Sequence, residues 1–358
     1  MSDDEERVRT PLEASRRRLL GAGGLGGLTV GAAGLLAACS SSAAGGTGSE
    51  AVGDYPLTPK WKWVFVSHLT GSALFRATKF GIQDATTITN CTYQWTGSAV
   101  SDVSQMVDAM DTAISSGADG IAVSLVHGKA FNGPTKKALD KGIPVVSFNA
   151  DAPENDRLAY IGQDLFRSGQ EMGKRIVSLI PSGKVAIFIA LPGSYTMQRR
   201  MDGAMQAIKD SGAPIEATAI GTGTQLSAEQ AKIDAYYQDN EDVKGMFAVD
   251  PGSTQSLGLV MKKYSLQGRV HGGGYDLMPT TLQLIKAGVL DFTIDQMPYY
   301  QGWIPAMYLY MYKLSGTLLA PSDTDTGLKF VTKDTVDPYL DMPNRYEGTS
   351  PTQQYVDS

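Results

Sequence analysis

The chain has 358 residues, a length that predicts two domains rather than one. Hydrophobic residues make up 42% of the chain and charged residues 19%, so it can bury a large core. The formal net charge of −6 argues against a nucleic-acid-binding surface. With two cysteines and three histidines, the composition excludes a disulfide framework and a cysteine-rich zinc site, and it indicates neither a metal nor a cofactor.

Residues 1–38 are typical of an export signal. Residues 15–20 (Ser-Arg-Arg-Arg-Leu-Leu) match a twin-arginine signal, and residues 19–38 carry no charge. Residues 36–39 (Leu-Ala-Ala-Cys) resemble the lipobox of bacterial lipoproteins, in which the cysteine is lipidated and becomes the mature N-terminus. A transmembrane anchor is the alternative, because twenty uncharged residues can span roughly 30 Å of hydrocarbon. The run is rich in glycine and only mildly apolar, which favours a cleaved signal.

We therefore expect a lipid at Cys39 to hold the protein on the outer side of the cytoplasmic membrane, in a periplasm or at the cell surface. Residues 39–58 are rich in serine, alanine and glycine. Such a composition predicts a flexible tether between the lipid and a folded body.

From residue 61 onward, short apolar runs typical of buried strands alternate with stretches of helical spacing. The predicted strands of the first half are 61–67, 87–95, 119–124, 144–149 and 158–162. The helices between them are 72–85, 101–116 and 129–141. The predicted strands of the second half are 184–191, 215–223, 243–250, 270–276 and 290–296. The helices of this half are 164–180, 197–212, 228–238, 253–264 and 279–287, and a last apolar helix covers 300–314.

This alternating order predicts an α/β fold with parallel sheets, because strands buried on both faces read as continuous apolar runs. The order restarts once, at about residue 164, which predicts two similar doubly wound lobes. In open α/β sheets the ligand site lies beyond the carboxyl ends of the strands. Polar residues that end strands are therefore the candidate site residues.

Several predicted strands end in polar residues or are followed closely by them: Ser67, His68, Asn149, Asp151, Asp250, Asp276 and Gln296. Phe75 and Arg200 lie near helix starts, and Gln225 lies in a loop before a helix. Carboxylates, carboxamides and a guanidinium supply acceptors and donors, and a ring offers an apolar face. That mixture suits a polyhydroxyl ligand and indicates binding, with no catalytic residue.

The same residues also have structural explanations. Asp250 and Asp276 could be N-caps, and Asn149 could be a turn residue. Gln296 could hydrogen-bond backbone groups, Phe75 could pack in the core, and His68 could be a polar loop residue. One of Arg199 and Arg200 is expected to pair with Asp202 on the surface. The sequence leaves open which of the two arginines faces the site.

From about residue 61 to residue 337 the chain resembles the periplasmic sugar-binding proteins of ABC importers, in the ribose-binding-like group. The matching segments are 66–68 (Val-Ser-His), 119–124 (Asp-Gly-Ile-Ala-Val-Ser), 142–149 (Gly-Ile-Pro-Val-Val-Ser-Phe-Asn), 160–164 (Tyr-Ile-Gly-Gln-Asp), 200–203 (Arg-Met-Asp-Gly), 275–276 (Tyr-Asp), 295–302 (Asp-Gln-Met-Pro-Tyr-Tyr-Gln-Gly) and 330–334 (Phe-Val-Thr-Lys-Asp). The resemblance implies a type I periplasmic binding protein, with two lobes joined by three hinge crossings.

By position, the crossings would lie near residues 163–164, near residue 296 and near 328–332. The N-terminal lobe would comprise 61–163 plus 297–327, the C-terminal lobe 164–296 plus 328–340, and 341–358 would form a tail.

The resemblance further implies a monomeric, non-enzymatic protein that closes around a sugar and delivers it to a membrane permease served by a cytoplasmic ATPase. Phe75 matches a stacking aromatic of the family, Asn149 a pocket amide or carboxylate, and Arg200 the pocket arginine. Asp250, Asp276 and Gln296 match polar ligand contacts.

Two departures from the family pattern bear on the ligand. Leu74 stands where a second aromatic residue is common, and Ala150 stands where many ribose-type binders have an arginine. Together with the motifs at 147–149 and 295–299, they favour a short linear polyol such as xylitol or threitol. A pentose, fructose or an inositol is the alternative.

Other classes of function are weaker interpretations. The effector domain of a LacI-type repressor shares this fold but needs an N-terminal helix-turn-helix, where this chain has the export signal. A glycosidase would use Asp250 and Asp276 as a carboxylate pair, although both acids also match binding positions. The sequence also allows a third interpretation, a signalling receptor that passes the closed form to a sensor. Finally, Cys91 is expected to be a buried free thiol within a strand.

Overall fold

The structure, a computed structural model, describes residues 58–340 and 345–346. The predicted export signal, with Cys39, lies outside the described residues. So do the predicted tether apart from residue 58, and the predicted tail apart from Arg345 and Tyr346. Within the described ranges, no helix combines the length and the apolar character needed to cross a bilayer.

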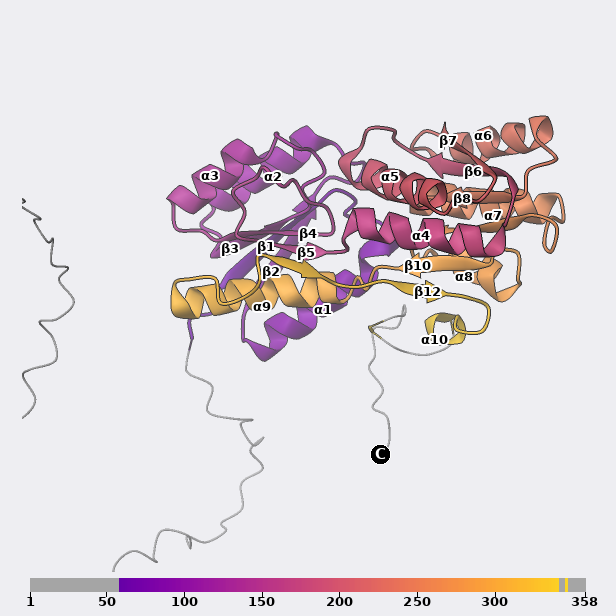
Figure 1. Ribbon diagram of the computed structural model, residues 1–358. Helices are drawn as coiled ribbons and strands as arrows, with labels where there is room; N and C mark the ends of the chain where they lie inside the picture. Colours follow the sequence, from indigo (N-terminus) through magenta and orange to yellow (C-terminus); the bar gives the residue numbers. More distant parts are fainter. Residues whose placement is uncertain (1–57, 341–344, 347–358) are drawn as a thin grey trace, which may run out of the picture. The chain divides into compact units, whose positions relative to one another are not determined.

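The first lobe is built on a six-stranded parallel sheet in the order β11-β5-β4-β3-β1-β2. Its strands are β1 (Lys62–Ser67), β2 (Thr92–Gly97), β3 (Gly120–Val123), β4 (Val145–Phe148), β5 (Ala159–Gly162) and β11 (Asp323–Asp325). A short 3-10 turn, Ala73–Phe75, precedes the first helix. In Figure 1, α2 (Val103–Ser115) and α3 (Asn132–Asp140) cover one face of this sheet, and α1 (Arg76–Ile88) and α9 (Tyr300–Ser315) cover the other.

The second lobe is built on a six-stranded sheet in the order β12-β10-β9-β8-β6-β7. Its strands are β6 (Gly183–Ile189), β7 (Ile215–Gly221), β8 (Gly245–Ala248), β9 (His271–Tyr275), β10 (Phe292–Asp295) and β12 (Lys329–Val331), of which β12 runs antiparallel to β10. One apolar core lies under α4 (Leu165–Leu179) and α5 (Tyr195–Asp210). The other lies under α6 (Leu226–Asp239), α7 (Pro251–Lys263), α8 (Pro279–Lys286) and α10 (Asp337–Leu340).

The chain passes between the two sheets three times: after β5, after β10 and between β11 and β12. The two α/β lobes and their three crossings confirm the predicted type I arrangement. After the second crossing, α9 returns to the first lobe and packs closely on α1. A Cβ at Gly81 would lie 2.1 Å from the Tyr299 carbonyl oxygen, and one at Gly302 would lie 2.0 Å from that of Thr78, so the helices meet at glycine.

The prediction of a strand over 87–95 is wrong at its start, because α1 continues to Ile88 and β2 begins at Thr92. The hydroxyls of two threonines near the end of α1 bond to carbonyl oxygens one turn back in the helix. Thr86 Oγ1 donates to the Ile82 carbonyl at 2.9 Å, and Thr87 Oγ1 donates to that of Gln83 at 2.7 Å. Cys91 is a buried free cysteine as expected, but it lies one residue before the strand.

Candidate functional site

Asn149 and Asp276 occupy matching places in the two lobes, directly after β4 and β9. Both have left-handed backbones, with φ of 64° and 73°, a conformation that asparagine and aspartate tolerate better than most residues. The Asn149 N–H donates to Ile161 O at 3.0 Å, and the Asp276 N–H donates to Ile294 O at 2.9 Å. The backbone therefore fixes both side chains where parallel strands end.

A chain of buried polar contacts joins four of the predicted site residues. Asn149 Nδ2 donates to Gln296 Oε1 at 3.3 Å, and Arg200 Nη2 donates to the same oxygen at 3.2 Å. Gln296 Nε2 in turn donates to Asp276 Oδ1. These four residues are between 2% and 6% exposed. The structure thus brings together a residue of the first lobe, two of the second lobe and one at the second crossing.

Arg200 is the arginine of the pair that belongs to this cluster. Its guanidinium lies over the Tyr275 ring, 4.2 Å from the centroid, and Nη1 donates to Val249 O at 3.3 Å. Its Nε is buried and has no hydrogen-bond partner among the described residues. Arg199 is exposed and lies over Phe166 instead.

The two acids differ in what their oxygens do. Asp250 is the N-cap of α7: Oδ1 accepts from the Ser253 N–H at 2.8 Å, and Oδ2 accepts from the Ala190 N–H at 2.8 Å. The structural explanation therefore holds for Asp250. It fails for Asp276, since Met278 is the N-cap of α8. Burial raises the pKa of both carboxyls, and for Asp276 the nearby Arg200 opposes that rise.

An aromatic cluster lies beside the end of β1. The His68 ring meets Phe75 edge to face at 5.3 Å between centroids, and Trp95 packs on Phe75 at 5.6 Å. Phe75 itself is 1% exposed, as its core explanation requires. Burial lowers the pKa of His68 to about 4, so the imidazole is neutral near pH 7.

Trp95 is an aromatic neighbour that the sequence analysis missed, because a tryptophan on an edge strand carries no site signal. The two polar residues at the end of β1 make local contacts. His68 Nδ1 lies 2.9 Å from Ser124 Oγ, and Ser67 Oγ accepts from the Leu69 N–H at 3.2 Å.

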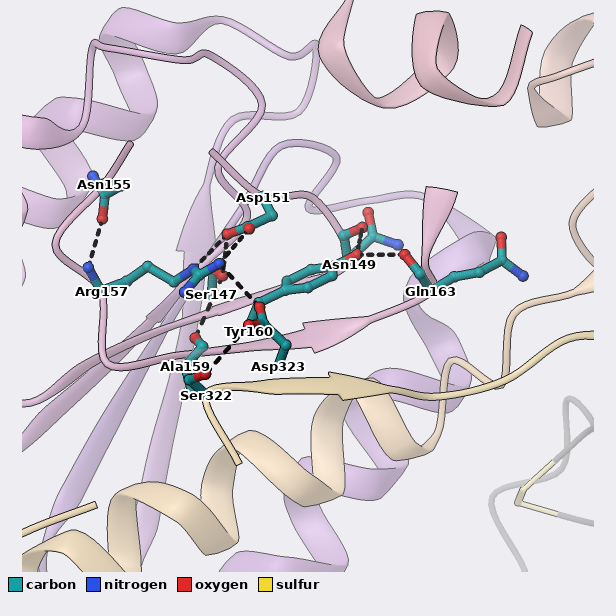
Figure 2. A network of polar contacts seen from close by, with 10 residues as sticks. All are labelled: Ser147, Asn149, Asp151, Asn155, Arg157, Ala159, Tyr160, Gln163, Ser322 and Asp323. Atoms are coloured by element: carbon teal, nitrogen blue, oxygen red, sulfur yellow. Dashed lines mark hydrogen bonds and ion pairs between the residues drawn. The ribbon is translucent and has the colours of Figure 1, made fainter. Parts of the chain in front are cut away.

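Asp151 forms an ion pair in the loop between β4 and β5 (Figure 2). Arg157 donates from Nε to Oδ1 at 2.6 Å and from Nη2 to Oδ2 at 2.5 Å, and Ser147 Oγ donates to Oδ1 at 2.7 Å. Arg157 lies six residues away in the same loop, and no feature of the sequence marked it as a site residue. Gln225, another predicted site residue, is exposed at the N-cap position of α6, and its side chain makes no capping hydrogen bond. Ligand roles for Asp151 and Gln225 stay predictions.

The three crossing segments are hydrogen-bonded to one another beside this cluster. Gln163 Nε2 donates to Gly327 O at 3.2 Å, and Thr326 Oγ1 donates to Gln296 O at 2.9 Å. Figure 2 shows the Tyr160 ring reaching between Asn149 and Gln163. Its hydroxyl donates to the carbonyl oxygens of Asn149 and Gln163, at 3.2 and 2.9 Å. The Asn149 loop and the first crossing are therefore tied together.

The site offers donors, acceptors and aromatic surface in a buried setting, a combination suited to holding a neutral polar molecule. Within the described part of the chain, no group of histidine, cysteine or acidic residues is arranged to hold a metal ion. Asp250 has its carboxylate oxygens committed to two backbone N–H groups, which leaves it poorly suited to act with Asp276 as a hydrolytic pair.

Comparison with known proteins places the chain in a family. The periplasmic binding protein domain matches residues 63–317. The chain is 46% identical to the xylose/arabinose-binding protein XylF of Sulfolobus acidocaldarius over 314 residues, which covers 83% of this chain and 77% of that protein.

Solved structures agree on the fold. A sugar-binding protein of a sugar ABC transporter from Bacillus halodurans superposes with a TM-score of 0.74 at 23% identity, covering 78% of this chain and 100% of that one. AraP, an arabinose-binding protein from Geobacillus stearothermophilus, gives a TM-score of 0.69 at 25% identity, covering 78% and 99%. The chain belongs to the periplasmic binding protein family. It is a solute-binding protein and not an enzyme, as predicted.

Proposed function

We propose that this protein is the sugar-binding component of an ABC importer and that its ligand is an aldopentose such as xylose or arabinose. The single observation that carries the proposal is the buried contact of Asn149, Gln296, Arg200 and Asp276, in which residues of both lobes meet at a crossing. Its donors and acceptors suit sugar hydroxyls. The pentose assignment is supported by the 46% identical relative named for xylose and arabinose.

The linear polyol favoured by the sequence analysis gains no support from the relatives, and the pentose alternative fits them better. Besides the motifs at 147–149 and 295–299, a missing aromatic at Leu74 and a missing arginine at Ala150 favoured the polyol. In the structure, Trp95 brings a second ring against Phe75, and Arg157 brings a guanidinium to the loop that follows Ala150. The first lobe therefore keeps a second aromatic ring and a guanidinium, although Leu74 and Ala150 do not supply them.

In the proposed mechanism, the ligand contacts groups of both lobes at once. Because those contacts exist together in the closed form alone, binding shifts the population toward closure. A membrane permease with a cytoplasmic ATPase would then receive the sugar from the closed form. Export by the twin-arginine signal, a lipid anchor at Cys39 and a monomeric state complete the proposal.

The test is a thermal-shift screen with D-xylose, L-arabinose, D-ribose, fructose, myo-inositol, xylitol and threitol, followed by calorimetry on each compound that binds. A ligand at 100 times its Kd adds about 2.7 kcal/mol to the free energy of unfolding. We expect a pentose to give the largest shift and to be recovered unchanged by chromatography. Tighter binding of xylitol or threitol would overturn the pentose assignment, and an altered sugar would indicate an enzyme.

A further inference from the structure

Gln301 is a fully buried glutamine in the first turn of α9, at the edge of the proposed site. Its Nε2 donates to Gln296 O at 2.9 Å, and its Oε1 accepts from Asn149 Nδ2 at 3.0 Å. A longer contact of 3.3 Å joins Nε2 to Thr326 Oγ1 on the third crossing. One carboxamide thus contacts a predicted ligand residue and two of the crossings.

The direction of these hydrogen bonds follows from groups that have one role. The backbone carbonyl of Gln296 can accept but not donate, so Gln301 must turn Nε2 toward it and Oε1 toward Asn149. Asn149 must then present its NH2 group to Gln301. An arginine can donate but not accept, so Gln296 must turn Oε1 toward Arg200, and this oxygen also requires the Asn149 NH2 group.

Both N–H bonds of Asn149 are used in this way, one on each glutamine oxygen. Among the described residues none donates to Asn149 Oδ1, which is left as an acceptor. Across the site, the buried Nε of Arg200 is a donor without a partner in the described part of the chain. The first lobe thus offers a ligand an acceptor, Asn149 Oδ1, and the second lobe offers it a donor, Arg200 Nε.

We propose that Gln301 is a positioning residue that fixes the Asn149 amide so that its carbonyl oxygen accepts a hydrogen bond from one hydroxyl of the ligand. The proposal rests on the proposed function for the identity of the ligand as a sugar. With Asn149 fixed in this way, the site selects the direction of the ligand's hydrogen bonds. The ligand hydroxyl that contacts Asn149 must donate, whereas the ligand oxygen that contacts Arg200 must accept. A purely structural role would stabilise the crossings without this selectivity.

The ligand arm of the test uses the pentose that binds most tightly, together with its deoxy and deoxyfluoro analogues at each ring position. Fluorine cannot donate a hydrogen bond. At one position of the sugar, both replacements should therefore weaken binding to the wild type by about tenfold, the upper range for one hydrogen bond. In Gln301→Met the Asn149 amide keeps only its longer 3.3 Å contact with Gln296 Oε1. It is then held less firmly, and the loss at that position should shrink to about threefold or less.

Two further variants separate positioning from stability. Gln301→Glu keeps an acceptor for Asn149 and should keep the wild-type pattern of analogue losses, even where overall affinity falls. Gln206→Met, at an exposed glutamine of α5 that bonds Asp210, is the matched control and should change neither affinity nor pattern. The same analogue pattern in Gln301→Met as in the wild type would overturn the proposal.

A second arm needs no ligand. Nuclear magnetic resonance of the Asn149 side-chain NH2 protons should show slow solvent exchange in the wild type and in Gln301→Glu, and at least tenfold faster exchange in Gln301→Met. Equal exchange in the three proteins would overturn the positioning role. If no sugar binds the wild type, the proposed function fails, while the exchange measurement still decides the role of Gln301.

Discussion

The two lobes use the same backbone arrangement at the site but different side chains. Asn149 and Asp276 follow equivalent strands with equivalent left-handed backbones. The first is a neutral amide, whereas the second is a buried carboxyl. Burial raises the pKa of this carboxyl, and the nearby Arg200 lowers it. The matching helix pairs are also built alike. Gly81 and Gly302 let α1 approach α9, and in the second lobe a Cβ at Gly169 would lie 2.0 Å from the Arg200 carbonyl oxygen.

Charge is therefore distributed unequally around one scaffold. In the first lobe, His68 is neutral and Asp151 is paired with Arg157. The buried carboxyls of the second lobe include Asp250, Asp276 and Glu229, and burial raises the pKa of each of these. One backbone arrangement thus supports two kinds of half-site, one in which the charges of Asp151 and Arg157 balance and one that contains Arg200 and buried carboxyls.

The first way to test this comparison is to break the ion pair of the first lobe. Arg157→Ala should lower the free energy of unfolding by about 3–5 kcal/mol, because it leaves the Asp151 carboxylate unpaired at a side chain 9% exposed. Urea unfolding measures the change. The double variant with Asp151→Ala should recover much of the loss, and Lys174→Ala, which breaks an exposed pair with Glu171, should cost less than about 1 kcal/mol. Equal losses in the single and double variants would contradict this account.

The second lobe should respond to pH through Glu229. Burial first, and repulsion from Asp250 second, raise the pKa of Glu229 from 4.5 to about 8. Because the folded pKa is the higher one, the unfolded chain releases this proton first as the pH rises. The stability contribution of this group is therefore complete below about pH 4.5 and is lost as the pH approaches 8.

Glu229→Gln should consequently raise the free energy of unfolding by about 1–3 kcal/mol at pH 8 and leave it nearly unchanged at pH 4. Chemical denaturation of both proteins across this range gives the difference directly. Glu171→Gln, which breaks a surface pair with Lys174 in α4, is the control, and it should change the free energy of unfolding by less than about 1 kcal/mol at pH 8. A difference that stayed constant with pH would show that Glu229 does not titrate in this window.

Arg200→Ala tests the charged half-site in binding. It removes the cation beside Asp276 and one donor to Gln296, so we expect the Kd for the ligand to rise at least tenfold, which is about 1.4 kcal/mol. Calorimetry measures the Kd, and circular dichroism checks that the variant is folded. Arg199→Ala is a matched control one residue away, and it should leave the Kd within about twofold. Similar effects at both arginines would remove the distinction between them.

The sequence could predict the fold because a βα alternation with continuously apolar strands permits few arrangements. It could also place Asn149, Asp276 and Gln296 at strand ends. It could not choose between Arg199 and Arg200, since adjacent helical residues differ by 100° in direction and the packing partner decides which is buried. In the structure, Arg200 is buried and lies over Tyr275, whereas Arg199 is exposed and lies over Phe166 of α4.

Gln301 and Arg157 were beyond sequence reasoning for another reason. Each acts on a candidate residue through the tertiary fold and carries no local signal of its own. Gln301 reaches Asn149 across 152 positions of the chain, and Arg157 meets Asp151 because the loop between β4 and β5 folds back on itself.

The smallest effect belongs to the neutral half-site. The pKa of His68 is lowered to about 4, so its imidazole carries no charge from pH 5 to pH 8. We expect His68→Asn to change the Kd by a factor that stays constant over this range, since neither side chain changes charge in it. The ratio of the two Kd values, measured by calorimetry at each pH, cancels the titration of groups common to both proteins. A ratio that changes with a midpoint between pH 6 and 7 would mean that His68 titrates like an exposed histidine, and the first lobe would then carry charge in the lower part of this range.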